Sequence, residues 1–297
     1  MKMFFRKIWR VLTAPFRFIL WIFKRIYRWI SNSLRGFNVL FLEEPEDTSL
    51  PESLAKAVQS PMDILDHLNE LRKNLFRALL FFLLTTALSF IFIQDLLDWI
   101  SAPIGGLDSL QAIEVTEPIG TVMRVALLAG FSSSLPYIIF ELWLFAAPGL
   151  KKRARIYGLI AIPIAFLFFI GGLAFAYYVM MPTALPFLIN FMGINTVPRP
   201  ASYVRFVTGL MFWIGVLFEF PLVIFVFASM GLIRAKTLAS QWRIAILIIA
   251  IAAAAITPTI DPVSMLLVMG PMIFLYFLSI GLAYIAQGRR DRARQET

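Results

Sequence analysis

Six long apolar runs, separated by short charged segments, occupy the chain from about residue 75 to residue 286. A helix needs about 20 apolar residues to cross a hydrocarbon core of about 30 Å. The runs predict membrane-spanning helices at 75–94, 119–146, 156–181, 205–232, 242–257 and 263–286. Because lipid offers backbone groups no partner, each run must pair its own backbone. The predicted fold class is therefore an all-α integral membrane protein with six transmembrane helices.

The charges between the runs predict which side of the membrane each loop faces. Lys and Arg gather before the first run and after the second, fourth and sixth runs. The alternate loops are mainly acidic, with Arg199 and Arg205 as the clear basic exceptions. The positive-inside rule then places both ends of the bundle in the cytoplasm, an N-in/C-in arrangement.

The segment before the first run has a different pattern. Residues 1–42 carry nine Lys and Arg and no acid. At about 100° per residue, most of these cations share one face of a helix, opposite Phe, Ile, Trp and Leu. This pattern predicts an added N-terminal amphipathic basic helix that lies on an anionic lipid surface, with binding to a partner helix as the alternative. We do not expect nucleic acid as a partner, since so apolar a helix favours lipid.

The chain then divides into four expected parts. Residues 1–42 are the basic arm, and residues 43–59 read as an acidic flexible linker. Residues 60–288 hold the six-span domain, and residues 289–297 form a basic cytoplasmic tail.

Composition narrows the chemistry that such a bundle can perform. The chain is 60% hydrophobic with a mean hydropathy of +0.80, and it has no Cys and one His. Disulfides, thiol nucleophiles and Cys/His metal clusters are therefore excluded. Phosphate-cradling glycine loops and nucleophile elbows are also missing from the sequence. We expect no catalytic residue, no metal and no cofactor, and hence no enzyme.

Glu219 interrupts the run at 205–232, within FWIGVLFEFP. Its place is near mid-membrane, where inserting an acid costs about 2.5–3.5 kcal/mol. One interpretation makes it a functional residue that faces the bundle interior. The other makes it a protonated group that is hydrogen-bonded within the bundle. Pro221, two residues later, frees a backbone carbonyl in the preceding turn and favours a polar notch there.

Two more acids lie toward the cytoplasmic side. Glu141 is expected about 15 Å inside the end of the second span, where a structural carboxylate and a ligand-binding one are equally compatible with the pattern. Glu70 belongs to an amphipathic segment that should lie along the cytoplasmic surface before the first span. Local pairing with Lys73 or Asn74 is the alternative to a binding role. His67 alone cannot form a multi-histidine metal site.

Six stretches of the sequence together resemble the TatC family, the multispanning subunit of the twin-arginine protein translocase. They follow one another in the family's order and spacing across about residues 60–288. The stretches are DHLNELRKNL, SAPI, ELWLFAAPGL, GGLAFAYYVMMP, FWIGVLFEFPLV and ITPTIDP.

The resemblance implies a receptor for folded precursors whose signal peptides carry paired arginines. In the family, the glutamate of the HLxELR motif helps to hold the arginine pair, and it corresponds to Glu70. The implied signal-peptide site comprises Glu70, His67, Leu71, Arg72, Phe145 and Pro148, and Glu141 is added to it as a hypothesis. Glu219 and Pro221 are implied to dock a partner's transmembrane helix, and Pro103 and Asp261 to have structural roles on the periplasmic side.

The resemblance also implies partners and a location. The partners are TatA- and TatB-like single-span proteins, and the chain is expected to form a homo-oligomer within a complex. The proton-motive force would drive export. The expected location is the cytoplasmic membrane of a prokaryote, because residues 1–42 do not have the composition of a transit peptide.

The chain departs from the family pattern after the second span. A second receptor glutamate usually follows the PGL motif, but APGLKKRARI has Ala154 at that position. Glu141 is the nearest acid that could replace it. Alternatively, the basic loop marks a paralogue with an altered signal preference.

Two other functions fit an acid-bearing bundle. A proton-coupled small-solute transporter would use Glu219 and Glu141 as relay acids. A structural scaffold would only hold other membrane helices. Co-purification with single-span proteins separates the transporter from the other two functions, and crosslinking of an arginine-pair peptide separates the receptor from the scaffold.

Overall fold

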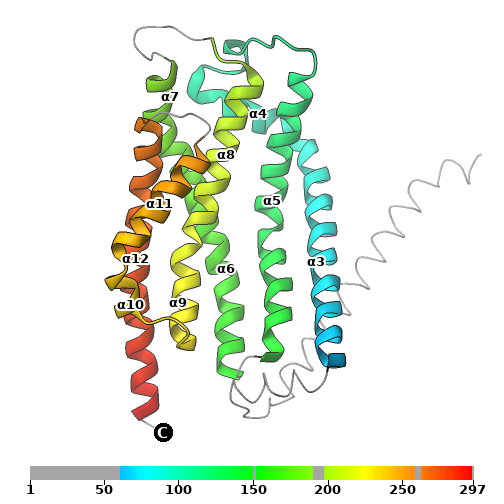
Figure 1. Cartoon of the computed structure of the whole chain (residues 1–297). Coiled ribbons are helices and arrows are strands. Elements are labelled where there is room, and N and C mark those ends of the chain that lie inside the picture. Colours follow the sequence, from blue (N-terminus) through cyan, green and yellow to red (C-terminus); the bar gives the residue numbers. More distant parts are fainter. Residues whose placement is uncertain (1–60, 150–151, 190–196, 258–261, 296–297) are drawn as a thin grey trace, which may run out of the picture.

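The computed structural model describes residues 61–149, 152–189, 197–257 and 262–295, and within these ranges the chain is helical with short connecting loops. The predicted arm and linker, residues 1–59, and Asp261 lie outside the described residues, so their predictions stay open. The helices run along one another in a single bundle (Figure 1).

The bundle begins with α3 (Pro61–Ser89), which leads through a short 3₁₀ turn into α4 (Ile93–Ser101). Further 3₁₀ turns lie at Ala102–Ile104, Leu107–Ser109 and Ala147–Gly149, and a π-helical turn at Ala176–Met180 joins α6 to α7. The remaining helices are α5 (Glu117–Ala146), α6 (Lys152–Phe175), α7 (Met181–Ile189), α8 (Pro200–Phe218), α9 (Phe220–Met230), α10 (Ala235–Ser240), α11 (Trp242–Ile256) and α12 (Pro262–Gln295).

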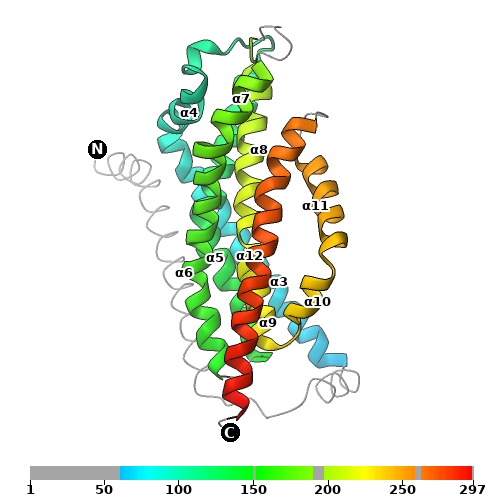
Figure 2. The same cartoon turned by 90° about the vertical axis from the view of Figure 1, so that its left-hand side faces the viewer.

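The predicted fold class is confirmed, because each predicted span falls on a helix. Among the described residues, five helical stretches are long and apolar enough to cross a membrane: His67–Ile104, Glu117–Ala146, Arg155–Ile189, Pro200–Met230 and Pro262–Gly288. The fifth predicted span corresponds to the shorter apolar helix α11, which at 15 residues is about 22 Å long. Helices α10 and α11 lie beside α12 (Figure 2).

Both described ends of the bundle lie at the same end of the molecule. The first turn of α3 and the last turn of α12 are at the bottom of Figure 1, whereas α4 and α7 are at the top. This placement agrees with an even number of crossings. We call the end with the start of α3 the cytoplasmic end, as the charge pattern predicts, and the opposite end the outer end.

The structure corrects one expectation at the first span. The sequence predicts that the segment around Glu70 lies along the cytoplasmic surface before the first span, but α3 is one uninterrupted helix over Pro61–Ser89. Pro61 occupies the first helical position, and neither Gly nor another Pro follows within the helix to end it. The HLxELR segment is therefore the cytoplasmic end of the first span itself.

Close backbone contacts hold the central helices together. Helix α3 packs along α5, α6 along α8, and α9 along α12. A Cβ atom on Gly172 of α6 would lie 2.7 Å from the Cα atom of Gly215 in α8, and one on Gly130 of α5 would lie 2.6 Å from the Cα atom of Thr86 in α3. Small residues allow such close helix packing in membranes, where the hydrophobic effect does not drive helix association.

The outer end is held by polar contacts between elements that are distant in sequence. Arg199, just before α8, forms ion pairs with Glu117 and Glu114, and its Nε donates to Glu117 Oε1 at 2.8 Å. The hydrogen bond to Glu117 raises the pKa of Arg199 above its usual value. Tyr203 donates to the carbonyl of Ile100 at 2.7 Å. Pro103 is exposed in the 3₁₀ turn that follows α4.

Candidate functional site

The cytoplasmic end brings together two of the sequence stretches that were singled out. Glu70 on α3 has a side chain 61% exposed, and its Oε2 lies 3.8 Å from Nδ1 of His67. His67 stacks on Phe145 of α5, with ring centroids 4.2 Å apart and planes inclined by 21°. The stack fixes the end of α3 against the end of α5 and leaves an open carboxylate beside two flat rings.

The other residues of the implied signal-peptide site surround this stack. Arg72 is exposed and Leu71 is half-buried on α3. Pro148 is exposed at the end of α5, and its carbonyl accepts a hydrogen bond from Arg155 Nη2 at 3.3 Å. Arg155 is only 4% exposed. This arginine of the basic APGLKKRARI segment therefore stabilises the connection between α5 and α6. Ala154 lies in the first turns of α6.

Glu141 occupies a different environment, between α5 and α3. It is 1% exposed, and Tyr137 donates a hydrogen bond of 2.5 Å to its Oε1. Arg77 Nη1 lies 3.8 Å from its Oε2, and Asn74 Nδ2 donates to its backbone carbonyl at 3.4 Å. We call Glu141, Tyr137, Arg77 and Asn74 the α3–α5 polar cluster. The carboxylate of Glu141 is thus engaged inside the bundle and is not displayed at the cytoplasmic surface.

Glu219 lies where the fourth span changes from α8 to α9. Its N–H donates to the carbonyl of Val216 at 3.1 Å, and its own carbonyl accepts from the N–H of Val223 at 3.0 Å. Pro221 is buried at the second position of α9, where its missing N–H interrupts the helical hydrogen bonds, as predicted. The interruption lies near the close passage of α6 and α8 at Gly172 and Gly215.

The Glu219 side chain is half-buried, and one of its two carboxyl oxygens is left unpaired. Its Oε1 is buried without a hydrogen-bond partner, and no cation from the described ranges pairs with the carboxyl group. A buried polar atom without a partner costs about 1–3 kcal/mol. The residue therefore offers an unused hydrogen-bonding group in the middle of the fourth span.

A family model, "Sec-independent protein translocase protein (TatC)", matches residues 66–271. The chain belongs to the TatC family. A TatC of Koribacter versatilis is 32% identical over 258 residues, covering 84% of this chain and 95% of its own. A TatC of Campylobacter jejuni is 36% identical over 227 residues, covering 73% of this chain and 92% of its own.

Solved structures agree with the sequence relatives. The chain is similar to the "Crystal Structure of Twin Arginine Translocase Receptor- TatC", with a TM-score of 0.65 and 30% identity over 74% of this chain and 99% of that chain. TatC proteins are multi-pass components of a protein translocase, a transport function and not a catalytic one. The predicted arm precedes the matched residues 66–271, so the family match says nothing about its role.

The sequence identified Glu70, Glu141 and Glu219 as candidate residues, but the contacts of Glu141 were not predicted. Tyr137 stands four residues before Glu141, a spacing that places both on one helical face, so this pair was readable in the sequence. The contact of Arg77 with Glu141 is not readable in the sequence, because it depends on how α3 is rotated against α5.

Proposed function

We propose that this chain is the receptor subunit for twin-arginine signal peptides in a Sec-independent translocase of a prokaryotic cytoplasmic membrane. The translocase would export folded proteins at the expense of the proton-motive force. One observation carries the proposal: in a TatC-family chain, the exposed Glu70 carboxylate stands beside the His67–Phe145 stack at the cytoplasmic end.

Glu70 has the chemistry to hold an arginine. A guanidinium is always charged and presents two parallel donors that match a carboxylate. Such a charge-assisted bond contributes about 1.5–3 kcal/mol. Phe145, held by His67, offers a ring face on which a second guanidinium could stack. The two arginines of a signal peptide would then use the carboxylate and the ring face.

We assign Glu141 a positioning role. It would need to leave Tyr137 and Arg77 to bind an incoming arginine, and its burial places it away from the surface where the peptide arrives. Its burial therefore argues against the idea that it replaces the acid missing at Ala154. The α3–α5 polar cluster instead holds α3 against α5, so that His67 meets Phe145.

Glu219 and the break before Pro221 suit a partner's transmembrane helix. The partner would be a TatA- or TatB-like single-span protein that places a polar side chain against the unpaired Oε1. Hydrogen bonds between transmembrane helices contribute about 0.6–1.7 kcal/mol, which fixes register without preventing release. A homo-oligomeric complex would present several such sites.

The basic arm, residues 1–42, is proposed to bind anionic lipid on the cytoplasmic side. Deleting residues 1–42 should leave the bundle inserted but lower the protein's affinity for anionic vesicles. Unchanged vesicle binding by the shortened chain would contradict this role.

The receptor function is tested by photocrosslinking. A signal peptide with two arginines and a photoreactive group beside them should crosslink to α3 and α5 near Glu70 in the full-length protein. Glu70→Gln should abolish most of the product, whereas Asp95→Asn, which neutralises an exposed acid at the outer end, should not. A peptide with two lysines is the matched ligand control. Equal crosslinking by the two peptides would contradict a twin-arginine receptor and leave a general scaffold.

A further inference from the structure

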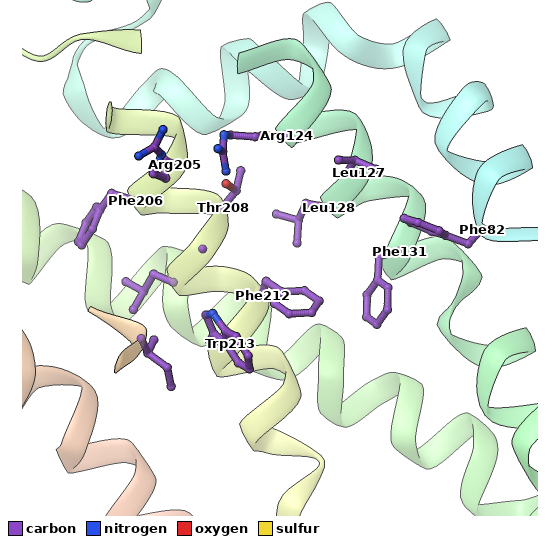
Figure 3. A pocket seen from close by; sticks show the side chains of 13 residues that line it. Phe82, Arg124, Leu127, Leu128, Phe131, Arg205, Phe206, Thr208, Phe212 and Trp213 are labelled. Carbon is purple, nitrogen blue, oxygen red and sulfur yellow. The ribbon is translucent and has the colours of Figure 1, made fainter. Parts of the chain in front are cut away.

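A pocket of about 490 Å³ opens near the outer end, between α5 and α8 and apart from the sites described above. Figure 3 shows Arg124 and Arg205 at one end of it, on different helices, with Phe131, Phe212 and Trp213 toward the other end. The lining residues that matter here are Arg124, Arg205, Thr208, Phe131, Phe212 and Trp213.

The charged end of the pocket lacks an acid. Within the described ranges, neither Arg124 nor Arg205 forms an ion pair, although Arg199, close by in sequence, is paired with two glutamates. Thr208 already donates its hydroxyl to the carbonyl of Val204 at 2.6 Å, so it has no donor left for a ligand. Two guanidinium groups without a carboxylate partner thus lie at the same end of the pocket, which favours an anion there.

The other end of the pocket is apolar and open at the side. Phe131 and Phe212 meet edge to face with centroids 5.1 Å apart, and Phe212 contacts Trp213 at 5.5 Å. Trp213 is 45% exposed. Arg205 and Trp213 are eight residues apart on α8, so the apolar wall extends about 12 Å from the cations toward mid-membrane. The pocket thus has cationic side chains at the outer interface and aromatic side chains closer to mid-membrane. This arrangement matches a molecule with an anionic head and an apolar tail.

We propose that this pocket binds an anionic phospholipid of the outer leaflet. Its phosphate lies between Arg124 and Arg205, and the upper part of one acyl chain lies along Phe131, Phe212 and Trp213, while the remaining lipid stays in the bilayer. A free phosphate ion would leave the apolar wall without a partner.

The charge contribution is tested on the full-length protein in nanodiscs. Native mass spectrometry would count the phosphatidylglycerol molecules retained when the protein is released from phosphatidylglycerol/phosphatidylcholine discs. Arg124→Gln with Arg205→Gln should weaken phosphatidylglycerol retention at least tenfold. Arg243→Gln, which removes an exposed arginine on α11, should not. The double lysine variant keeps both charges and should retain most of the lipid.

The shape contribution is tested without changing charge. A Cβ atom on Gly209, which lines the pocket, would meet no atom within 4 Å, so Gly209→Leu should fill the pocket without disturbing the packing. Gly281→Leu is the matched control, because that glycine on α12 is equally uncrowded and lies outside the pocket lining. Gly209→Leu should lose phosphatidylglycerol retention, whereas Gly281→Leu should keep it.

Three results would overturn the proposal. Undiminished phosphatidylglycerol retention in both the double glutamine and Gly209→Leu variants would show that the lipid does not occupy this pocket. Complete displacement of the lipid by millimolar inorganic phosphate would assign the pocket to a free anion. Loss of single-span partner proteins with unchanged lipid retention would assign it to a protein helix. Unaltered circular dichroism and size-exclusion profiles would show that each variant is folded.

Discussion

Glu141 and Glu219 both lie deep within the membrane-spanning helices, and their surroundings differ. Glu141, in the α3–α5 polar cluster, accepts a hydrogen bond from Tyr137 and faces the guanidinium of Arg77. Glu219, at the break between α8 and α9, has a buried oxygen without a partner among the described residues. Each carboxylate has one buried oxygen without a hydrogen bond, but that of Glu141 faces Arg77 at 3.8 Å, whereas Glu219 faces no cation of the described residues. The ion-paired acid stabilises the fold, whereas the unpaired one is available to another molecule. The comparison separates a structural carboxylate from a docking carboxylate.

The comparison predicts opposite effects on stability. Glu141→Ala removes the acceptor of Tyr137 and the anion facing Arg77, so it should lower the free energy of unfolding by about 3 kcal/mol. Glu219→Ala removes a polar atom that has no partner and should leave the free energy of unfolding unchanged or slightly higher. Denaturant-induced unfolding in detergent measures both variants. Equal destabilisation by the two substitutions would contradict the distinction between a structural and a docking carboxylate.

Partner binding should be more sensitive to the substitution of Glu219 than to that of Glu141. Glu219→Ala should weaken co-purification of single-span partners by about three- to twenty-fold, the equivalent of roughly 0.6–1.7 kcal/mol. Glu219→Gln keeps a hydrogen-bonding group and should have a smaller effect. Quantitative pull-down from solubilised membranes checks this result. Full partner binding by Glu219→Ala would show that the unpaired oxygen is not used for docking.

The smallest expected effect concerns one hydroxyl. Tyr137→Phe deletes the 2.5 Å bond to Glu141 while keeping the ring that contacts Phe81. We expect a loss of about 1 kcal/mol in the free energy of unfolding and no change in partner binding. The same unfolding assay detects it. A loss as large as that of Glu141→Ala would mean that Tyr137, and not Arg77, accounts for the stability of the cluster.

The helices could be predicted from the sequence because each span is encoded locally. The length of each apolar run predicted a membrane-spanning helix, and Pro221 predicted the break beside Glu219. The ion pair of Arg199 with Glu117 could not be predicted, because it joins the starts of two helices 82 residues apart. The contact of Arg77 with Glu141 depends on helix rotation, which no local pattern contains. The prediction that the segment around Glu70 lies along the membrane surface was wrong, because an amphipathic pattern does not by itself end a helix.

The most direct test of the account is export of a folded reporter with a twin-arginine signal peptide, in cells that carry Glu70→Gln or Glu219→Gln as the only copy of this protein. We predict that Glu70→Gln reduces export at least tenfold, that Glu219→Gln also impairs it, and that the outer-end control Asp95→Asn leaves it unchanged. Export at the normal rate by both Glu70→Gln and Glu219→Gln would contradict the account.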